Sequence, residues 1–417
     1  MARVTSGNTV CVVGAGIVGV SAALTLQRDG HDVLLIDRDG PAAGASSGNA
    51  GAIVNASCAP TALPGTAATV FGMIGRPLAP FNVRAAYLPR ALPWMLRFLM
   101  ESRIARVREN ARNLHALTAG AVSAWHAMTR GTPMSKLLRP AGWLKVYETE
   151  SAFAGTRHAR LLMDELAVPY EILGANEIRE LEPALAPIFS RGLFQRDSLQ
   201  VTSPSKLVHG LADLFVAGGG RFRRWNVLRV DSGGSKPVLH GPSESLAADV
   251  VVIAAGAWSG SLAASIGDRV LLDTERGYHL MLPVQNSNLL RRPVQNGEHF
   301  FVLSPMEDGL RLTSQVELAG LEGAPDYRRV RGLVAAAARM LPGLESGEQS
   351  VWMGCRPSLP DSLPVLGYSP TSRRIVYAFG HQHLGMTLGP ASALIVADLV
   401  AGRTPSLDLR PYRVDRF

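Results

Sequence analysis

The chain has 417 residues, of which 47% are hydrophobic and 18% charged, so it is long enough to bury at least one large core. This composition excludes a disordered tail, a disulfide-stabilised miniprotein and a fibrous rod. The three cysteines, Cys11, Cys58 and Cys355, are far apart and form no C-x-x-C pair, so they predict neither a disulfide framework nor a zinc site. A reducing, cytoplasmic setting is the expectation.

The charge balance is basic, with 42 Lys and Arg against 34 Asp and Glu and a net charge of +8. Almost all of the cations are arginines, and a bias this uniform is more typical of codon composition than of a binding patch. No nucleic-acid motif is present, and no basic run is interleaved with aromatic residues. Nucleic acid is therefore not an expected partner.

The N-terminus lacks the charged-then-apolar order of a signal peptide, because a strand-like run begins at Thr9. The stretch from Val10 to Leu26 is apolar enough to resemble a membrane span. Three glycines interrupt it, however, and it is shorter than the roughly 20 residues that a span needs. We expect no transmembrane segment, whereas peripheral association with the inner membrane stays open.

The first residues predict a dinucleotide-binding unit. A buried strand over residues 9–13 is followed by Gly14-Ala-Gly16-Ile-Val-Gly19, and then by a helical pattern up to Arg28. A second strand ends at Asp37, at the distance from Gly16 that the G-x-G-x-x-G fingerprint requires. Strand, helix, second strand and terminal acid together indicate dinucleotide binding far more specifically than the glycines alone.

Each part of this unit has a chemical role. Gly14 permits the tight turn, Gly16 lets the backbone approach a pyrophosphate, and Gly19 lets the helix pack close to the strand. The helix N-terminus presents free N–H groups to phosphates, and Asp37 accepts ribose hydroxyls. The predicted contacts are Gly14, Gly16, Ile17, Val18, Gly19, Asp37 and Arg38.

A second loop rich in Gly and Ser follows and ends at Gly51. It could bring more backbone N–H groups to a pyrophosphate or a flavin ring, or it could be a plain connector. Its Gly44-Ala-Ser-Ser-Gly48 segment matches the serine-hydrolase pattern G-x-S-x-G, but the strand and helix that this pattern needs are missing, so a hydrolase is not expected. The candidate contacts in the loop are Ser46, Ser47, Asn49, Ala50 and Gly51.

Further motifs lie far from the N-terminus: residues 249–259, residues 352–367 with Gly354-Cys-Arg-Pro, and residues 380–390 with Gly-His-Gln-His-Leu-Gly. With these segments in this order, the chain resembles the FAD-dependent amine and amino-acid oxidoreductases of the D-amino-acid oxidase type. That family includes glycine oxidase, sarcosine oxidase and bacterial D-amino-acid dehydrogenases, and the ending Val414-Asp-Arg-Phe417 is similar to the dehydrogenase branch.

The resemblance implies an α/β fold and FAD as the cofactor. We expect a Rossmann-like FAD-binding domain of the glutathione-reductase type, built from residues 1–60, 195–266 and 352–417. An inserted α+β substrate domain with a mixed sheet would comprise residues 61–194 and 267–351.

The same resemblance implies the remaining flavin contacts. The strand end near Ala255 would pass the dinucleotide moiety, the strand near Val227 would contact the adenine, and the segment starting at Gly380 would run along the flavin pyrimidine. The contacts so implied are Val227, Ala255, Gly256, Trp258, Gly380, His381, Leu384, Gly385, Met386 and Thr387. Core packing is the alternative for Trp258. His381 and His383 lack a nearby Cys, Asp or Glu, so we expect no metal site.

The substrate contacts are likewise implied by the resemblance. Arg356 resembles the family's arginine that pairs with the substrate carboxylate, for which a planar guanidinium is suited. His383 falls where glycine oxidase has a second polar contact. Tyr278 and His279 depart from the common dehydrogenase sequence and either reach the substrate or pack within a strand. Cys355 lies about one residue from the position at which sarcosine oxidases attach FAD covalently.

The reaction implied is dehydrogenation of a D-amino acid to the imino acid, by hydride transfer from the α-carbon to flavin N5, with a quinone or another acceptor taking the electrons. Residues Tyr278, His279 and His383 favour D-proline or cis-4-hydroxy-D-proline. The alternatives are a glycine- or sarcosine-type oxidase that uses oxygen, and the flavin-bearing subunit of a hetero-oligomeric amine or opine dehydrogenase.

A basic stretch with bulky apolar residues extends from Arg84 to Arg112, where seven arginines face two glutamates. It predicts two amphipathic helices that cover the substrate domain. Docking on an anionic membrane or a respiratory partner is the alternative.

Overall fold

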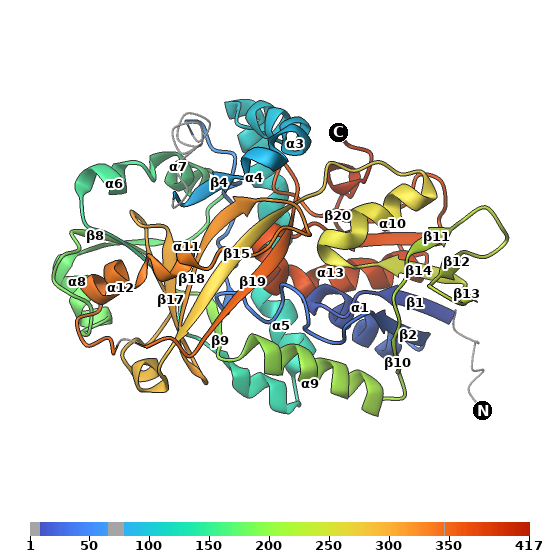
Figure 1. Cartoon of the computed structure of the whole chain (residues 1–417), viewed down its shortest axis with the longest axis horizontal. Coiled ribbons are helices and arrows are strands. Elements are labelled where there is room, and N and C mark those ends of the chain that lie inside the picture. The colour runs from blue at the N-terminus through green and yellow to red at the C-terminus, as the bar shows by residue number, and fades with distance from the viewer. Residues whose placement is uncertain (1–8, 66–78, 346) are drawn as a thin grey trace.

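Two large β-sheets organise the computed structural model, which describes residues 9–65, 79–345 and 347–417. In Figure 1 they form two lobes, with β1, β2 and β14 in the right lobe and β8, β17 and β18 in the left lobe. Strands β15 and β19 of the left lobe run along the boundary between the lobes. The two lobes therefore meet along one edge of the second sheet.

The two strands predicted at the N-terminus, residues 9–13 and the strand that ends at Asp37, are neighbours in the six-stranded sheet. Its order is β10 (Arg221–Arg224), β2 (Asp32–Asp37), β1 (Thr9–Val13), β14 (Val250–Ile253), β21 (Ile375–Phe379) and β20 (Val365–Tyr368). All neighbours pair in parallel except β20 and β21. Such a sheet is stable only when both faces are covered, which explains why its central strands are apolar throughout.

Helices cover one face of this sheet, and a small sheet with one helix covers the other. The first layer contains α1 (Ile17–Arg28), α5 (Ala121–Thr129), α9 (Pro204–Ala217) and α13 (Gly385–Val400). The second layer contains β11 (Arg229–Asp231), β12 (Val238–His240), β13 (Ser245–Ala247) and α10 (Ser259–Ile266). Ser203 caps α9, since its hydroxyl accepts a hydrogen bond from the Lys206 N–H.

The β1–α1 turn has no room for side chains. Gly14 has φ +108°, and a Cβ there would lie 2.3 Å from the Ala254 carbonyl oxygen. A Cβ on Gly19 would lie 1.8 Å from the Gly14 carbonyl oxygen. The first and third glycines of the fingerprint are therefore required by the backbone itself.

The nine-stranded sheet is mixed. Its order is β19 (Ser350–Ser358), β15 (Asp273–Leu282), β18 (Gly309–Leu318), β17 (Phe301–Met306), β16 (Val294–Asn296), β6 (Trp143–Tyr147), β8 (Arg191–Gln195) and β7 (Glu171–Gly174), with β4 (Phe81–Val83) beside β18. The pairs β16–β6 and β18–β4 are parallel, whereas the other pairs are antiparallel. The expected α/β fold with a mixed second sheet is confirmed.

The remaining elements connect or cover these sheets. A three-stranded sheet contains β3 (Ala52–Ile53), β9 (Leu199–Val201) and β5 (Leu138–Arg139). The other helices are α3 (Leu88–Glu101), α4 (Ile104–Thr118), α6 (Glu150–Ala154), α7 (Arg157–Glu165), α8 (Ala175–Leu181), α11 (Arg328–Arg331) and α12 (Val334–Met340). The two helices predicted within the basic stretch 84–112 are α3 and the first part of α4.

The expected domain limits differ from the structure at two places, the first being α5, which belongs to the expected substrate segment 61–194 but packs on α13 in the layer that covers the six-stranded sheet. Residue 352 lies inside β19, and β19 pairs along its length with β15 of the second sheet. We propose that the last FAD-domain segment starts after Ser358, where β19 ends.

One helical stretch among the described residues, Gln382–Val400, is long and apolar enough to cross a membrane by length and composition. It comprises α13 and the turn before it, and 61% of its most apolar window is buried. Because α13 packs between α1 and α5, it acts in this fold as a core helix.

Candidate active site

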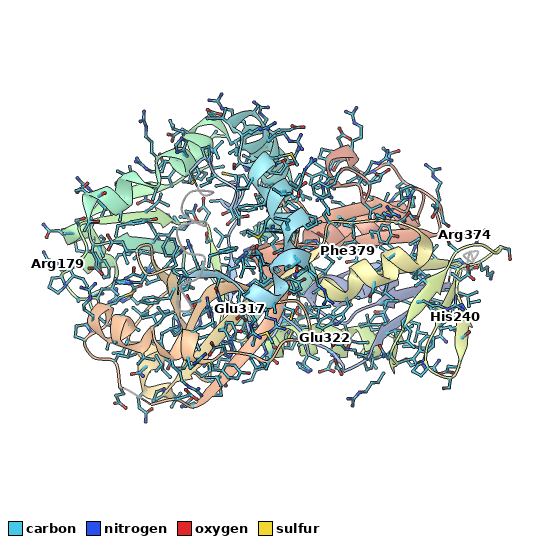
Figure 2. The ribbon with its side chains drawn as sticks, turned by 45° about the horizontal axis from the view of Figure 1, so that its top comes forward. Arg179, His240, Glu317, Glu322, Arg374 and Phe379 are labelled. Atoms are coloured by element: carbon cyan, nitrogen blue, oxygen red, sulfur yellow. The ribbon has the colours of Figure 1, made fainter. Side chains whose placement is uncertain are left out.

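A cavity of about 440 Å³ extends from the β1–α1 turn to β19. Residues of both large sheets and of the loops between them line it. Two of its lining residues, Glu322 and Phe379, are labelled in Figure 2, where they lie at the junction of the two lobes, whereas Arg179 and His240 mark opposite ends of the molecule. The cavity thus connects the dinucleotide fingerprint with the predicted substrate arginine.

Most of the predicted site residues line this cavity. These are Gly14, Gly16, Ile17, Val18, Asp37, Arg38, Ser46, Asn49, Val227, Ala255, Gly256, Trp258, Arg356, Gly380, His381, His383, Gly385 and Met386. The predicted residues that are not part of its lining are Gly19, Ser47, Ala50, Gly51, Tyr278, His279, Leu384 and Thr387. Some of the latter hold the lining in place; the Thr387 hydroxyl, for example, accepts a hydrogen bond from the Val54 N–H.

The fingerprint end of the cavity offers an anion site and a ribose site. The first free N–H groups of α1 face Ser46, whose hydroxyl oxygen accepts a hydrogen bond from the Ile17 N–H at 2.9 Å. The Asp37 carboxylate accepts three backbone hydrogen bonds, from Ala15, Asp39 and Gly40. Since a carboxylate has about four acceptor positions, one remains for a ribose hydroxyl.

The predicted adenine end contains a stacked cation and ring. The Arg38 guanidinium lies 4.1 Å from the centroid of the Trp258 ring, and both residues line the cavity. Val227 also lines it, but from the connection between β10 and β11 rather than from a strand as expected. Because Trp258 lines the cavity, a cofactor contact is favoured over pure core packing for this residue.

The Gly- and Ser-rich loop is fastened to the second sheet through its carbonyl groups. Arg311 of β18 donates to the carbonyl oxygens of Ser47 and Asn49, at 3.1 and 2.8 Å. His279 of β15 contacts the Gly48 carbonyl oxygen through Nδ1 at 2.9 Å, and the Ser304 hydroxyl donates to the Ala50 carbonyl oxygen at 2.8 Å. Four consecutive carbonyl groups therefore point to the second sheet.

This anchoring leaves backbone donors for a ligand. The N–H groups of Gly48, Asn49 and Ala50 have no acceptor among the hydrogen bonds of the described residues, and Gly48 and Asn49 line the cavity. Burial lowers the pKa of Arg311 to about 10, which keeps it charged at neutral pH behind these donors. A row of free N–H groups backed by a cation suits a pyrophosphate and an electron-rich flavin edge, so these residues fit FAD.

At the opposite end of the cavity, Arg356 of β19 crosses the neighbouring strand β15 at Gly277. A Cβ on Gly277 would lie 2.0 Å from a guanidinium nitrogen of Arg356, so the arginine can adopt this position only beside a glycine. Burial lowers the pKa of Arg356, and the charge of Glu275 opposes that shift. The guanidinium thus forms part of the cavity wall at a place where a carboxylate could approach it.

A buried acid and a half-exposed imidazole lie next to this arginine. His383 Nε2 is 2.8 Å from a carboxylate oxygen of Glu275, whose side chain is only 5% exposed. Burial by itself would raise the pKa of Glu275, but the hydrogen bond from His383 and the charges of His383 and Arg356 hold it below its usual range. An ionised Glu275 accepts the proton on Nε2, which leaves Nδ1 as the free acceptor of the imidazole.

Tyr278 does not reach the cavity. Its side chain is fully buried on the other face of the sheet, where the hydroxyl donates to Glu317 at 2.5 Å. We therefore do not retain it as a substrate contact. Arg276, two positions earlier, donates to the Gly320 carbonyl oxygen and is not part of the cavity lining either.

His279 does not line the cavity, but it packs against a residue that does. Its ring stacks on the lining residue Trp352 with centroids 5.1 Å apart, and burial, followed by the Arg311 charge, lowers its pKa to about 4. The neutral ring therefore carries its proton on Nδ1 towards the Gly48 carbonyl oxygen. The other flanking histidine, His381, is also neutral because burial lowers its pKa to about 3, and it contacts the Ser392 hydroxyl.

Several residues of this site escaped the sequence analysis as site residues. They are Glu275, Gly277, Arg311, Glu322 and Trp352. For Glu275 and Gly277 the sequence did contain a signal. Side chains alternate along a strand, so these two residues share a face with the predicted site residue His279, whereas Tyr278 lies on the opposite face. Arg311 and Glu322 have no such signal, because their roles depend on contacts between distant segments.

Comparison with known proteins agrees with this geometry. The family model of FAD-dependent oxidoreductases matches residues 9–399. The chain is 34% identical to a D-amino-acid oxidase of Bradyrhizobium diazoefficiens, over 99% of both chains, and 28% identical to a D-amino acid dehydrogenase of Rhizobium johnstonii, over 98% of this chain and 99% of that protein.

Solved structures show the same fold. A glycine oxidase of Geobacillus kaustophilus superposes with a TM-score of 0.70 at 25% identity and covers 98% of this chain and 99% of its own. An L-amino acid deaminase of Proteus vulgaris superposes with a TM-score of 0.75 at 16% identity, over 100% of this chain and 99% of its own. The match over nearly the whole chain, together with a cavity whose donors fit FAD, means that this chain belongs to the family of FAD-dependent oxidoreductases.

Proposed function

We propose that this protein is an FAD-dependent enzyme that oxidises a D-amino acid at its α-carbon. The observation that carries the proposal is Arg356, which lies in the wall of the cavity that also contains the dinucleotide fingerprint. The names of two relatives, a D-amino-acid oxidase and a D-amino acid dehydrogenase, support the choice of substrate class. Bound FAD supplies the acceptor for the two electrons of the substrate C–H bond.

In the proposed mechanism, Arg356 pairs with the substrate carboxylate. A bidentate guanidinium fixes the carboxylate in one plane and so sets the direction of the Cα–H bond. Hydride transfer depends strongly on this direction, because only a near-linear approach brings the hydride to its acceptor. Trp352, held by its stack on His279, supplies an apolar wall beside Arg356.

His383 would accept a proton from the substrate ammonium group. The amine must be neutral before its lone pair can help to expel the hydride, so one N–H proton must leave first. With Nε2–H donated to Glu275, Nδ1 of His383 can take this proton, and the Glu275 carboxylate stabilises the resulting imidazolium. The product imine then hydrolyses to a 2-oxo acid and ammonia, or stays cyclic if the substrate is a proline.

The side chain and the electron acceptor are the finer parts of the proposal. We infer a quinone or another non-oxygen acceptor, in line with the dehydrogenase relatives, although the relative named as an oxidase makes oxygen the direct rival. D-proline and cis-4-hydroxy-D-proline remain our specific substrates. Their support now rests on His383, because Tyr278 and His279 do not face the cavity.

A substrate panel tests the proposal. We expect the purified FAD-loaded chain to reduce an artificial dye with D-amino acids and to prefer each D-isomer to its L-isomer. Parallel measurement of peroxide in air separates the acceptors, since an oxidase yields one peroxide per imine. Turnover of L-isomers only, or of no amino acid, would refute the proposed function.

Replacing Arg311 should weaken FAD binding. In Arg311→Met, the carbonyl groups of Ser47 and Asn49 lose their donor and the loop loses its supporting charge, so we expect the FAD dissociation constant to rise about tenfold or more. Fluorescence titration of the apoprotein measures this. Arg339→Met, which removes an exposed arginine paired with Glu148, is the matched control and should leave the constant unchanged.

Replacing Gly277 should damage substrate binding without affecting FAD. In Gly277→Ala the new methyl group collides with the Arg356 guanidinium, so we expect KM for the amino acid to rise by about one to two orders of magnitude. Steady-state kinetics with the dye acceptor, together with the flavin absorbance, measure both effects. Gly120→Ala, at a position with open space around it, controls for a glycine substitution as such. An unchanged KM in Gly277→Ala would remove Arg356 from the substrate site.

The pH dependence of kcat/KM should report the His383–Glu275 pair. Because the pKa of Glu275 is held below its usual range, Glu275 is ionised at neutral pH and accepts the hydrogen bond from His383. In Glu275→Gln the carboxylate that accepts this hydrogen bond is lost, so we expect kcat/KM at neutral pH to fall and the acid limb of the profile to change. In His383→Gln that limb should disappear. His158→Gln, an exposed histidine of α7, should keep the parent profile, and the same profile in all four proteins would exclude His383 as the proton acceptor.

A further inference from the structure

The exposed side of α3 is apolar. Leu88, Leu92, Leu96 and Met100 follow one another at intervals of four residues, and they are 37%, 48%, 52% and 43% exposed. Residues spaced in this way lie along one side of a helix. Ile104, the first residue of α4, is also exposed, at 55%. We call these five residues the α3 stripe.

The stripe is not the side by which α3 packs on the protein. Ala91, Trp94 and Met95 are buried against Val83 and Leu318. The helix is therefore apolar on its buried side and on its exposed side. An isolated exposed leucine is ordinary, but a continuous apolar row over several turns is typical of an interaction surface.

The segment that contains the stripe is rich in arginine. The segment from Arg84 to Arg112 contains seven arginines and two glutamates. One of the glutamates, Glu101, is only 1% exposed and is neutralised by Arg97 and Arg106. Arg90 and Arg103 are exposed and have no carboxylate partner among the ion pairs of the described residues. Their charges are thus available to an anionic surface.

Contacts at its base tie α3 to the substrate end of the cavity. The Trp94 indole N–H donates to the carbonyl oxygen of Ser358, two residues after Arg356, at 3.1 Å. Just before the helix, Arg84 donates to the Ala324 carbonyl oxygen, in the loop that also carries the lining residue Glu322. In Figure 2 the cyan helices of this region lie at the front, above the labels of Glu317 and Glu322.

We propose that the α3 stripe, with Arg90 and Arg103, docks onto an anionic lipid bilayer. The apolar row would enter the boundary between headgroups and acyl chains, and the arginines would contact anionic headgroups. A second copy of the chain is a poorer occupant, because it would bring two arginine-rich segments together. The docking itself goes beyond the proposed function; its consequence, that the substrate end of the cavity lies near lipid-soluble quinones, rests on that function.

Vesicle co-sedimentation of the FAD-loaded chain tests the proposal. The probes are vesicles of phosphatidylcholine alone and of phosphatidylcholine with phosphatidylglycerol at about 3:1. We expect the bound fraction to be about fivefold higher with the anionic vesicles and to fall in about 0.5 M NaCl. The double variant Leu92→Gln with Leu96→Gln should lose binding to both, and Arg90→Gln with Arg103→Gln should lose the preference for anionic vesicles.

The matched control is Val216→Gln with Leu394→Gln, two equally exposed apolar residues on α9 and α13, which should bind like the parent protein. Flavin absorbance and circular dichroism verify that each variant is folded. A parent protein that stays in the supernatant, or a stripe variant that binds like the parent, would overturn the proposal. So would a parent dimer that the stripe variant converts to monomers, since the stripe would then be a subunit interface.

Vesicle binding and turnover are independent readouts. Binding with no amino-acid turnover would refute the proposed function alone, and turnover of a D-amino acid with a soluble dye but without binding would refute the docking alone.

Discussion

The structure depends on how one loop is held between two sheets. The chain from Ser46 to Ala50 lies between α1 and the second sheet, and its carbonyl groups are taken up by Arg311, His279 and Ser304. Each peptide group that turns its carbonyl to the sheet turns the following N–H away from it. The anchoring by the substrate domain thereby creates the donors that the FAD-binding domain presents to its cofactor.

Side chains alternate between the two faces of strand β15, and the two faces have different roles. On one face, Glu275 forms a hydrogen bond with His383, and Gly277 leaves room for the Arg356 side chain. On the same face, the His279 ring stacks on Trp352. On the other face, Tyr278 closes the core of the second sheet and binds Glu317. A shift of one residue in the register would exchange these two sets, so the pairing of β15 with β19 and β18 defines the substrate end of the cavity.

Helix α3 serves both stability and an outer surface, through different residues on its two sides. Its buried side fixes it to the end of β19 and to the loop that contains Glu322. Its exposed side carries the apolar side chains of Leu88, Leu92, Leu96 and Met100. Because both sides are rigidly linked, an attachment through α3 would also fix the orientation of the cavity entrance relative to whatever surface the protein binds.

The sequence by itself determined the parts that depend on local chemistry. Strand β1, the glycine turn, helix α1 and Asp37 follow from periodicity and glycine geometry within about thirty residues. Arg356 and His383 came from motif resemblance. The tertiary structure alone decided which side chains meet: Arg311 binds a loop more than 250 positions away, Glu275 contacts His383 across 108 positions, and Tyr278 points away from the cavity. Such contacts depend on strand register and on the packing of distant segments, which a linear sequence does not encode locally.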